Sequence, residues 1–127
     1  MTAHIIDTSA WIEYLEGSSK GEKVNKLLKT NEEIYIISII LSEVISKIRR
    51  SNSNVDLAYN SLIKNTKIFE ITPRIAKEAG LLHAETRLRM PSFALADALI
   101  ICAAKALKAK ILTTDNHFKS FKEAIVL

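Results

Sequence analysis

The chain has 127 residues, a size that fits one ordinary domain covering residues 1–127 and leaves little room for a second core. With 48% hydrophobic and 25% charged residues, no repeats and only three glycines and two prolines, it is typical of a globular protein without long flexible linkers. Its net charge of +4 is compatible with a polyanionic partner but is too small to predict one.

The first half of the chain predicts two strands and four helices. Short β-branched and apolar runs indicate strands, and apolar residues at spacings of three and four indicate amphipathic helices. Asp7, Thr8 and Ser9 are all suited to cap the first helix, and Ser38 to cap the third. In chain order we expect a strand at 4–7, a helix at 9–15, a loop at 17–21, a helix at 23–29, a strand at 34–37, and helices at 38–50 and 55–64.

The second half continues the alternation of strands and helices. Thr72 before Pro73 is a typical helix start, and Ser92 is suited to cap the last helix. We expect a strand at 67–71, a helix at 73–87, a break at 90–92, a helix at 93–107, and strands at 110–113 and 124–127. This order predicts an α/β fold, a three-layer α/β/α sandwich around a parallel sheet of four to five strands with right-handed crossovers.

Three features bear on location. Cys102 is the only cysteine, so no intramolecular disulfide can form, and the apolar run around it predicts a buried thiol. A single thiol fits a reducing compartment. Residues 1–7 lack the pattern of a signal peptide, and the longest aliphatic stretch, 34–41, is far shorter than the ~20 residues that span a bilayer. We therefore expect a cytoplasmic protein with no membrane contact.

Two aspartates follow strands in equivalent positions. Asp7 ends the first predicted strand, and Asp115 closely follows the strand at 110–113. In open parallel sheets, ligands bind beyond the carboxyl ends of the strands, where the strand order reverses. If these two strands are neighbours at that point, both carboxylates face one crevice. The alternative is local, with Asp7 a helix cap and Asp115 a turn residue.

Two further carboxylates lie on apolar helix faces. Asp97 has apolar residues three and four positions away on both sides, so it must be desolvated unless it reaches a partner or a metal. Alternatively, the dipole of the helix favours a negative charge in its first turns. Glu43 follows Ile39 and Ile40, and Lys47 on the next turn offers it an exposed ion pair worth only ~0.3–0.5 kcal/mol.

The combination of these four carboxylates points to a cation. Two carboxylates about 4 Å apart repel each other by roughly 4 kcal/mol at an effective dielectric near 20. Such a cluster therefore persists only with shared protons or a bound cation. Oxygen ligands without a convincing cysteine or histidine set favour Mg²⁺ or Mn²⁺ over zinc, and an ion of this kind can activate water for attack on phosphorus.

Four short motifs occur in order, each weak alone but specific together over an α/β pattern. They are Ile5-Ile-Asp-Thr-Ser-Ala10, Leu41-Ser-Glu-Val44, Leu95-Ala-Asp-Ala-Leu-Ile100 and Leu112-Thr-Thr-Asp-Asn-His-Phe118. With them the chain resembles, over essentially its whole length, the PIN-domain family and within it the VapC-type toxins of prokaryotic toxin–antitoxin pairs. The residues that resemble the acidic quartet of the family are Asp7, Glu43, Asp97 and Asp115.

The resemblance implies an endoribonuclease that hydrolyses RNA phosphodiester bonds with a metal-activated water. The quartet would hold Mg²⁺ or Mn²⁺, as one ion or as two ions ~3.5–4 Å apart. Thr8, Ser9 and Thr114 match hydroxyl positions of the family, and would orient the metal ligands by hydrogen bonds. Local helix capping explains Ser9 equally well.

The resemblance also implies partners: a homodimer, and a protein antitoxin that blocks the active site. Trp11, Tyr14 and Leu15 could be partly exposed and serve that contact, or they could simply be core residues. Four arginines, two on the helix at 38–50 and two near the end of the helix at 73–87, are candidate contacts to RNA phosphates. They are Arg49, Arg50, Arg87 and Arg89.

The last motif departs from the family pattern. Asn116 and His117 stand where many relatives carry a further acidic residue, which bears on a second metal site. His117 could contact phosphate or accept a proton, or it could be a surface turn residue; His4 and His83 suggest no catalytic arrangement.

The sequence also leaves other functions open. A PIN-like module that binds RNA or a partner without cleaving is the main alternative, although a pure binder gains nothing from negative charge facing phosphate. A receiver-like domain would need two adjacent acidic residues after the first strand, where Ile6 precedes the single Asp7. A haloacid-dehalogenase-like phosphatase would need an aspartate where Ser9 stands.

Overall fold

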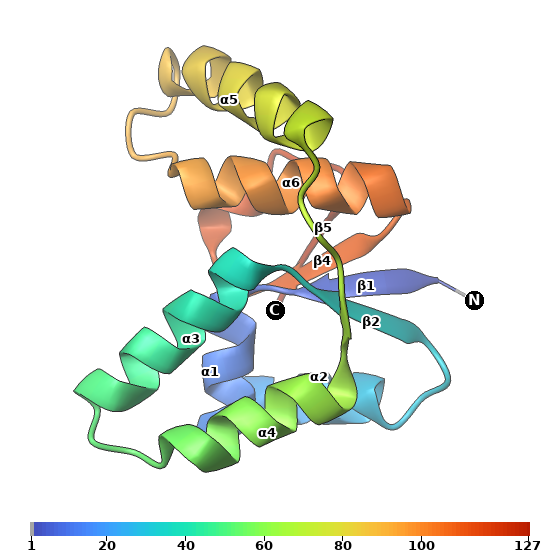
Figure 1. Cartoon of the computed structure of the whole chain (residues 1–127), viewed down its shortest axis with the longest axis vertical. Helices are drawn as coiled ribbons and strands as arrows, with labels where there is room; N and C mark the ends of the chain where they lie inside the picture. The colour runs from blue at the N-terminus through green and yellow to red at the C-terminus, as the bar shows by residue number, and fades with distance from the viewer. Residues whose placement is uncertain (1) are drawn as a thin grey trace.

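The structure, a computed structural model, describes residues 2–127. Within them the chain forms alternating strands and helices (Figure 1). In chain order these are β1 (Ala3–Ile6), α1 (Thr8–Glu16), α2 (Ser19–Leu28), β2 (Glu33–Ile36), α3 (Ser38–Arg50), α4 (Val55–Asn65), β3 (Lys67–Ile68), α5 (Pro73–Arg87), α6 (Leu95–Leu107), β4 (Lys110–Thr113), the 3₁₀ helix η1 (Asn116–Phe118) and β5 (Ala124–Val126).

The strands form one parallel sheet in the order β3-β2-β1-β4-β5, which confirms the predicted α/β fold. The chain builds outward from β1 through β2 to β3, then returns to the other side of β1 for β4 and β5. Strands β1 and β4 are therefore neighbours where the order reverses, with Ile5 opposite Ile111 and Ile6 opposite Leu112. Their carboxyl ends meet at the edge where an α/β sheet binds its ligands.

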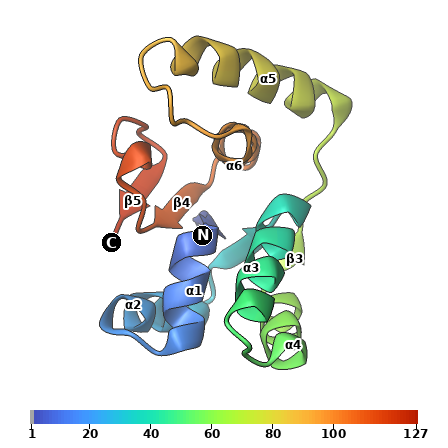
Figure 2. The ribbon, with the colours of Figure 1, turned by 90° about the vertical axis from the view of Figure 1, so that its left-hand side faces the viewer.

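Helices cover both faces of the sheet, as the sandwich prediction required. Helices α5 and α6 lie on one side, with α6 against β1 and β4 and α5 packed outside it. On the other side, α1 packs against α2 and α3 packs against α4 (Figure 2). Because helices cover both faces, the central strands are apolar on both sides, and Ile5, Ile6 and Ile111 are fully buried. Cys102 is also buried, as predicted.

Several element boundaries differ from the predictions. Strand β3 covers only residues 67–68 of the predicted 67–71. It stops there because its partner β2 ends at Ile36, and the Ile36 carbonyl accepts the last hydrogen bond between them, from the Phe69 N–H. Ile37, without a side-chain cap, precedes α3, so the prediction that Ser38 caps this helix is wrong. Ser92 does not cap α6 either: the helix starts later, after Ala94, and the Asp97 carboxylate accepts the Ala94 N–H instead.

Helix α2 begins four residues earlier than predicted, inside the expected loop. The Ser18 hydroxyl accepts the Gly21 N–H and caps the helix, which draws Gly21 into its first turn. There the Gly21 backbone lies directly against Glu13 of α1, and a Cβ atom would overlap that backbone. A glycine at this position therefore permits the close packing of α1 on α2. Over residues 2–127, none of the helices has both the length and the apolar character that crossing a bilayer requires.

Candidate metal centre

Asp7 is the central carboxylate at the carboxyl edge of the sheet. Its N–H donates to the Leu112 carbonyl at 2.9 Å, which fixes the end of β1 against β4. As the N-cap of α1, its side chain accepts the Thr8 N–H at 2.8 Å, and it also accepts the hydroxyls of Thr113 at 2.9 Å and Ser9 at 3.3 Å. Burial raises the pKa of Asp7 to about 6, although the hydrogen bonds from Thr113 and Thr8 oppose the shift.

Hydroxyl groups from two elements hold Asp7 in place. The fully buried Thr113 hydroxyl, besides donating to Asp7, accepts the N–H of Asp115 at 3.0 Å. The Ser9 hydroxyl lies 3.3 Å from that of Thr113 and accepts the N–H of Thr114 at 3.1 Å. The sequence predicted a hydroxyl role for Thr114, whereas in the structure Thr114 contributes its amide and Thr113 the hydroxyl. A polar residue ending the buried run of β4 was the signal for Thr113.

Glu43 enters the site from α3. Its Oε1 accepts the Thr8 hydroxyl at 2.8 Å, so Thr8 connects the start of α1 to α3. The sequence allowed an exposed ion pair between Glu43 and Lys47. Within residues 2–127 the structure contains no such pair. Glu43 instead faces the cluster, where its charge raises the pKa of Asp7 and Asp97.

Asp97 approaches from the first turn of α6. Its Oδ2 accepts the Ala94 N–H at 3.1 Å, which satisfies one amide at the start of the helix. The carboxylate is half-buried, and its pKa is raised by burial and by the charges of Asp115 and Glu43. The helix-start interpretation and the cluster interpretation of the sequence thus both describe this residue.

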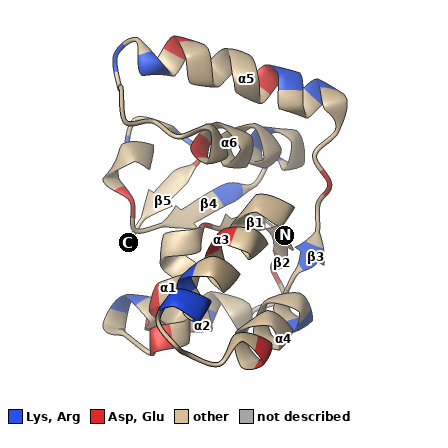
Figure 3. Ribbon diagram, turned by 60° about the vertical axis from the view of Figure 1, so that its left-hand side comes forward, with Lys and Arg blue, Asp and Glu red and all other residues tan. Residues whose placement is uncertain are grey.

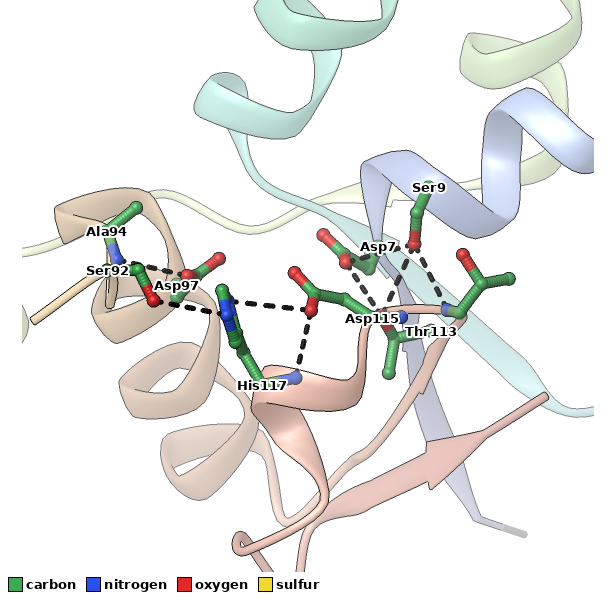
Figure 4. A network of polar contacts seen from close by, with 9 residues as sticks. Asp7, Ser9, Ser92, Ala94, Asp97, Thr113, Asp115 and His117 are labelled. Atoms are coloured by element: carbon green, nitrogen blue, oxygen red, sulfur yellow. Dashed lines mark hydrogen bonds and ion pairs between the residues drawn. The ribbon is translucent and has the colours of Figure 1, made fainter. Parts of the chain in front are cut away.

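Asp115 and His117 complete the edge of the site. Asp115 caps η1 by accepting the His117 N–H at 2.9 Å, and this turn brings the imidazole back over the carboxylate. Donor atoms of Asp97, Asp115 and His117 all lie within 4.8 Å of one another. Figure 4 shows these side chains in a row with Asp7 along the sheet edge. The sequence pointed to His117 as a possible phosphate contact, proton acceptor or surface turn residue, but not as a neighbour of Asp97.

The donor set fits a hard divalent cation. Neighbouring carboxylates raise the pKa of Asp7 and of Asp97. Within residues 2–127, the donor groups close enough to share an ion are those of Asp97, Asp115 and His117, a set that does not include Asp7 or Glu43. Cys102, the only thiol, does not belong to this group. Carboxylate oxygens with at most one imidazole suit Mg²⁺ or Mn²⁺.

Comparison with known proteins places the chain in a family. The sequence model of the PIN-domain family matches residues 4–124 of this chain.

The chain belongs to the PIN-domain family.

Solved structures show the same fold. VapBC2 of Rickettsia felis, solved with a DNA fragment from its promoter, is 20% identical and superposes with a TM-score of 0.77 over 99% of this chain and 98% of that one. DNA-bound VapBC of Salmonella typhimurium is 18% identical, with a TM-score of 0.77 over 100% and 98%. VapC20 of Mycobacterium tuberculosis, a toxin that cleaves the sarcin–ricin loop, is 13% identical, with a TM-score of 0.73 over 94% and 95%. A search of curated proteins found no match.

The candidate RNA contacts of this PIN domain divide into two groups. Arg50, on the last turn of α3, lines a hollow of about 320 Å³ together with Glu43 and Lys47. Arg49 is exposed on the same turn but does not line the hollow. The other two, at the end of α5 and in the following connection, are exposed and lie outside it; they are Arg87 and Arg89.

The three large apolar residues of α1 that the sequence offered for an antitoxin contact differ in their burial. Trp11 is fully buried, so of the two alternatives for this residue the structure supports the core position. Tyr14 and Leu15 are half-buried and line a separate hollow of about 400 Å³ between α1, α2 and α4. Leu57 of α4, which is 68% exposed, lies on its rim.

Proposed function

We propose that this PIN domain is a Mg²⁺- or Mn²⁺-dependent endoribonuclease and the toxin of a VapBC-type toxin–antitoxin pair, acting in the cytoplasm. The observation that carries the proposal is the buried Asp7 carboxylate, held by hydroxyls at the switch point of the sheet and close enough to Asp97 and Glu43 for their charges to act on it. Burying such a charge beside like charges is costly unless a cation binds there.

The chain's own residues would hold the cation and orient the substrate. Asp7, Glu43, Asp97 and Asp115 would be the ligands of one or two ions, with Thr113, Thr8 and Ser9 fixing their orientation. When bound, the cation lowers the pKa of a water and offsets the charge on the phosphate. Three of these carboxylates accept a hydrogen bond within residues 2–127 on one oxygen only, which leaves the other oxygen free to bind the cation. They are Glu43, Asp97 and Asp115.

Positive charge beside the site supports RNA as the substrate. Lys47 and Arg50 line the hollow next to Glu43, and neither forms an ion pair within residues 2–127. In Figure 3, basic residues occupy the last turns of α3, while an acidic residue marks its part nearer the sheet. A phosphate next to the scissile one would therefore find two cations beside the Glu43 carboxylate. Of the four candidate arginines, Arg50 has the strongest geometric support.

The toxin assignment and its partners rest on the similar structures. Two of them are VapBC complexes, and a third is a toxin that cleaves the sarcin–ricin loop. By analogy, this chain would form a homodimer and bind a protein antitoxin. The hollow lined by Tyr14, Leu15 and Leu57 offers half-buried and exposed apolar surface for that antitoxin.

Cleavage of a mixed tRNA and rRNA pool by antitoxin-free protein tests the proposal. We expect cuts with Mn²⁺ or Mg²⁺, none with EDTA, and none from Asp7→Asn under any condition. Asp56→Asn is the matched control, because Asp56 is exposed in the first turn of α4 and lies outside the site. Metal-independent cutting, or cutting by Asp7→Asn, would refute the mechanism. Tight RNA binding without cleavage would instead favour the non-cleaving module.

A further inference from the structure

The imidazole of His117 is positioned at both of its ring nitrogens. Nε2 lies 3.2 Å from the Ser92 hydroxyl, in the connection that leads into α6. Nδ1 lies 3.5 Å from Oδ1 of Asp115, beyond the usual length of an N–H···O hydrogen bond. The ring therefore spans the gap between the loop after β4 and the start of α6 (Figure 4).

The Ser92 hydroxyl can bond the ring in either tautomer, and a bound cation would select the one that carries its proton on Nε2. If Ser92 accepts a hydrogen bond from Nε2–H, the neutral ring carries its lone pair on Nδ1, facing the Asp115 carboxylate. Two acceptors that face each other without a proton between them repel. A cation bound by both atoms removes the repulsion, and the hydrogen bond at the far nitrogen then orients the ligand, as is usual for metal-bound histidines.

The spacing of the donor atoms agrees with a shared ion. Neighbouring ligands of an octahedral ion with bonds of about 2.1 Å lie about 3 Å apart, and opposite ligands about 4 Å apart. Donor atoms of Asp97, Asp115 and His117 lie within 4.8 Å of one another, so small side-chain rotations would seat them. The His117 and Asp115 side chains are 42% and 37% exposed, which leaves room for water and phosphate on the ion.

We propose that His117 is a nitrogen ligand of the cation site, bound through Nδ1 beside Asp97 and Asp115. The inference rests on the proposed function and adds to its metal preference. Oxygen-only sites suit Mg²⁺, whereas an imidazole favours transition metals, so the site selects Mn²⁺ over Mg²⁺. The histidine that departs from the acidic pattern of the family thus changes which ion is bound, without removing a ligand.

Electron spin-echo spectroscopy of bound Mn²⁺ tests the ligand directly, because a coordinated imidazole nitrogen modulates the echo. The protein is used tag-free, so that no imidazole of an affinity tag binds the ion. We expect ¹⁴N modulation from the native chain and from His83→Gln, whose ring bonds the Phe93 carbonyl instead. We expect Mn²⁺ binding without that modulation in His117→Gln.

The outcomes separate this inference from the proposed function. Bound Mn²⁺ without ¹⁴N modulation in the native chain, or with modulation that persists in His117→Gln, overturns the role of His117 and leaves the nuclease standing. No Mn²⁺ binding at all overturns both.

Metal selectivity gives an independent readout. In His117→Asp the third donor becomes an oxygen, so the preference for Mn²⁺ over Mg²⁺, measured by calorimetric titration of each ion, should fall by about tenfold. An unchanged ratio of the two dissociation constants would overturn the proposed selectivity.

Discussion

Replacing Asp7 by asparagine should stabilise the metal-free protein at neutral and alkaline pH while abolishing its activity. The pKa of Asp7 is raised by burial from an ordinary 3.8 to about 6, so the fold favours the protonated carboxyl. Between these two values the unfolded chain binds fewer protons than the folded chain, and stability falls as the pH rises through this window. Below pH 3.8 the carboxyl costs nothing, and above pH 6 its full ionisation cost is present.

The magnitude follows from the two pKa values. At 1.36 kcal/mol per pH unit, the difference between 3.8 and about 6 costs the folded state about 3 kcal/mol at pH 8. At pH 4 the same relation gives only about 0.6 kcal/mol. The introduced asparagine would keep the bond from Thr8 or Thr113 but lose one acceptor, at about 1 kcal/mol. The net gain from Asp7→Asn is therefore about 2 kcal/mol at pH 8 and close to zero at pH 4.

Thermal unfolding in EDTA at the two pH values measures this effect. At roughly 4 °C per kcal/mol for a chain of this size, the Tm of Asp7→Asn should exceed that of the native chain by about 8 °C at pH 8. Added Mn²⁺ should raise the native Tm and raise that of the variant less, because the ion binds only the folded site. A variant less stable than the native chain at pH 8, or a gain that is the same at pH 4, would refute the reasoning.

Three further predictions address the surroundings of the site and the packing beneath it. Thr113→Val removes the donor to Asp7 and leaves the Asp115 N–H without its acceptor, so stability should fall by about 1–3 kcal/mol in urea titration and Mn²⁺ affinity by about tenfold. Removing both cations of the hollow, Lys47→Ala with Arg50→Ala, should raise the KM for RNA up to about tenfold with little change in kcat, and should flatten its salt dependence. Gly21→Ala forces α1 and α2 apart and should cost about 1–3 kcal/mol in urea titration.

Matched variants control each of these changes. Thr113→Ser keeps the hydroxyl and should behave like the native chain; equal losses in Ser and Val would refute the hydrogen-bonding role. Arg49→Ala removes a neighbouring cation outside the hollow, so an effect as large as that of the double variant would show that only general charge matters. Gly80→Ala adds a Cβ to α5 where nothing lies within 4 Å, and should be neutral or slightly stabilising, since Ala favours helix.

The order of elements was predictable from sequence because burial dictates it. Continuous apolar runs such as Ile5-Ile6 and Ile111-Leu112 suit strands that are covered on both faces, and the three- and four-residue spacing in α3 identifies its buried side. Boundaries were harder, because tertiary contacts decide them. The pairing of β3 stops where β2 stops, and the start of α2 depends on a serine cap together with the contact of Gly21 with α1.

The candidate quartet was likewise predictable, since carboxylates that follow strands or interrupt apolar helix faces stand out. The supporting groups were not. Whether Thr113 or Thr114 points at Asp7 depends on the register of β4 against β1, and a shift by one residue exchanges them. The position of His117 depends on the turn after β4 and on Ser92, 25 residues away in sequence. Local patterns contain neither relation.

For the aspartates of the site, the sequence left open a choice between a local helix cap and a metal ligand. The two roles are compatible in the structure. Asp7, Asp97 and Asp115 each accept a backbone N–H at the start of a helical segment, and that bond fixes the direction of the carboxylate. For Asp97 and Asp115 one oxygen satisfies the helix start, while the other makes no hydrogen bond within residues 2–127. The positive ends of α1 and α6 offset part of the repulsion among these carboxylates. Capping thus places the negative charges close together before any ion binds, and an ion that then enters meets ligands already oriented.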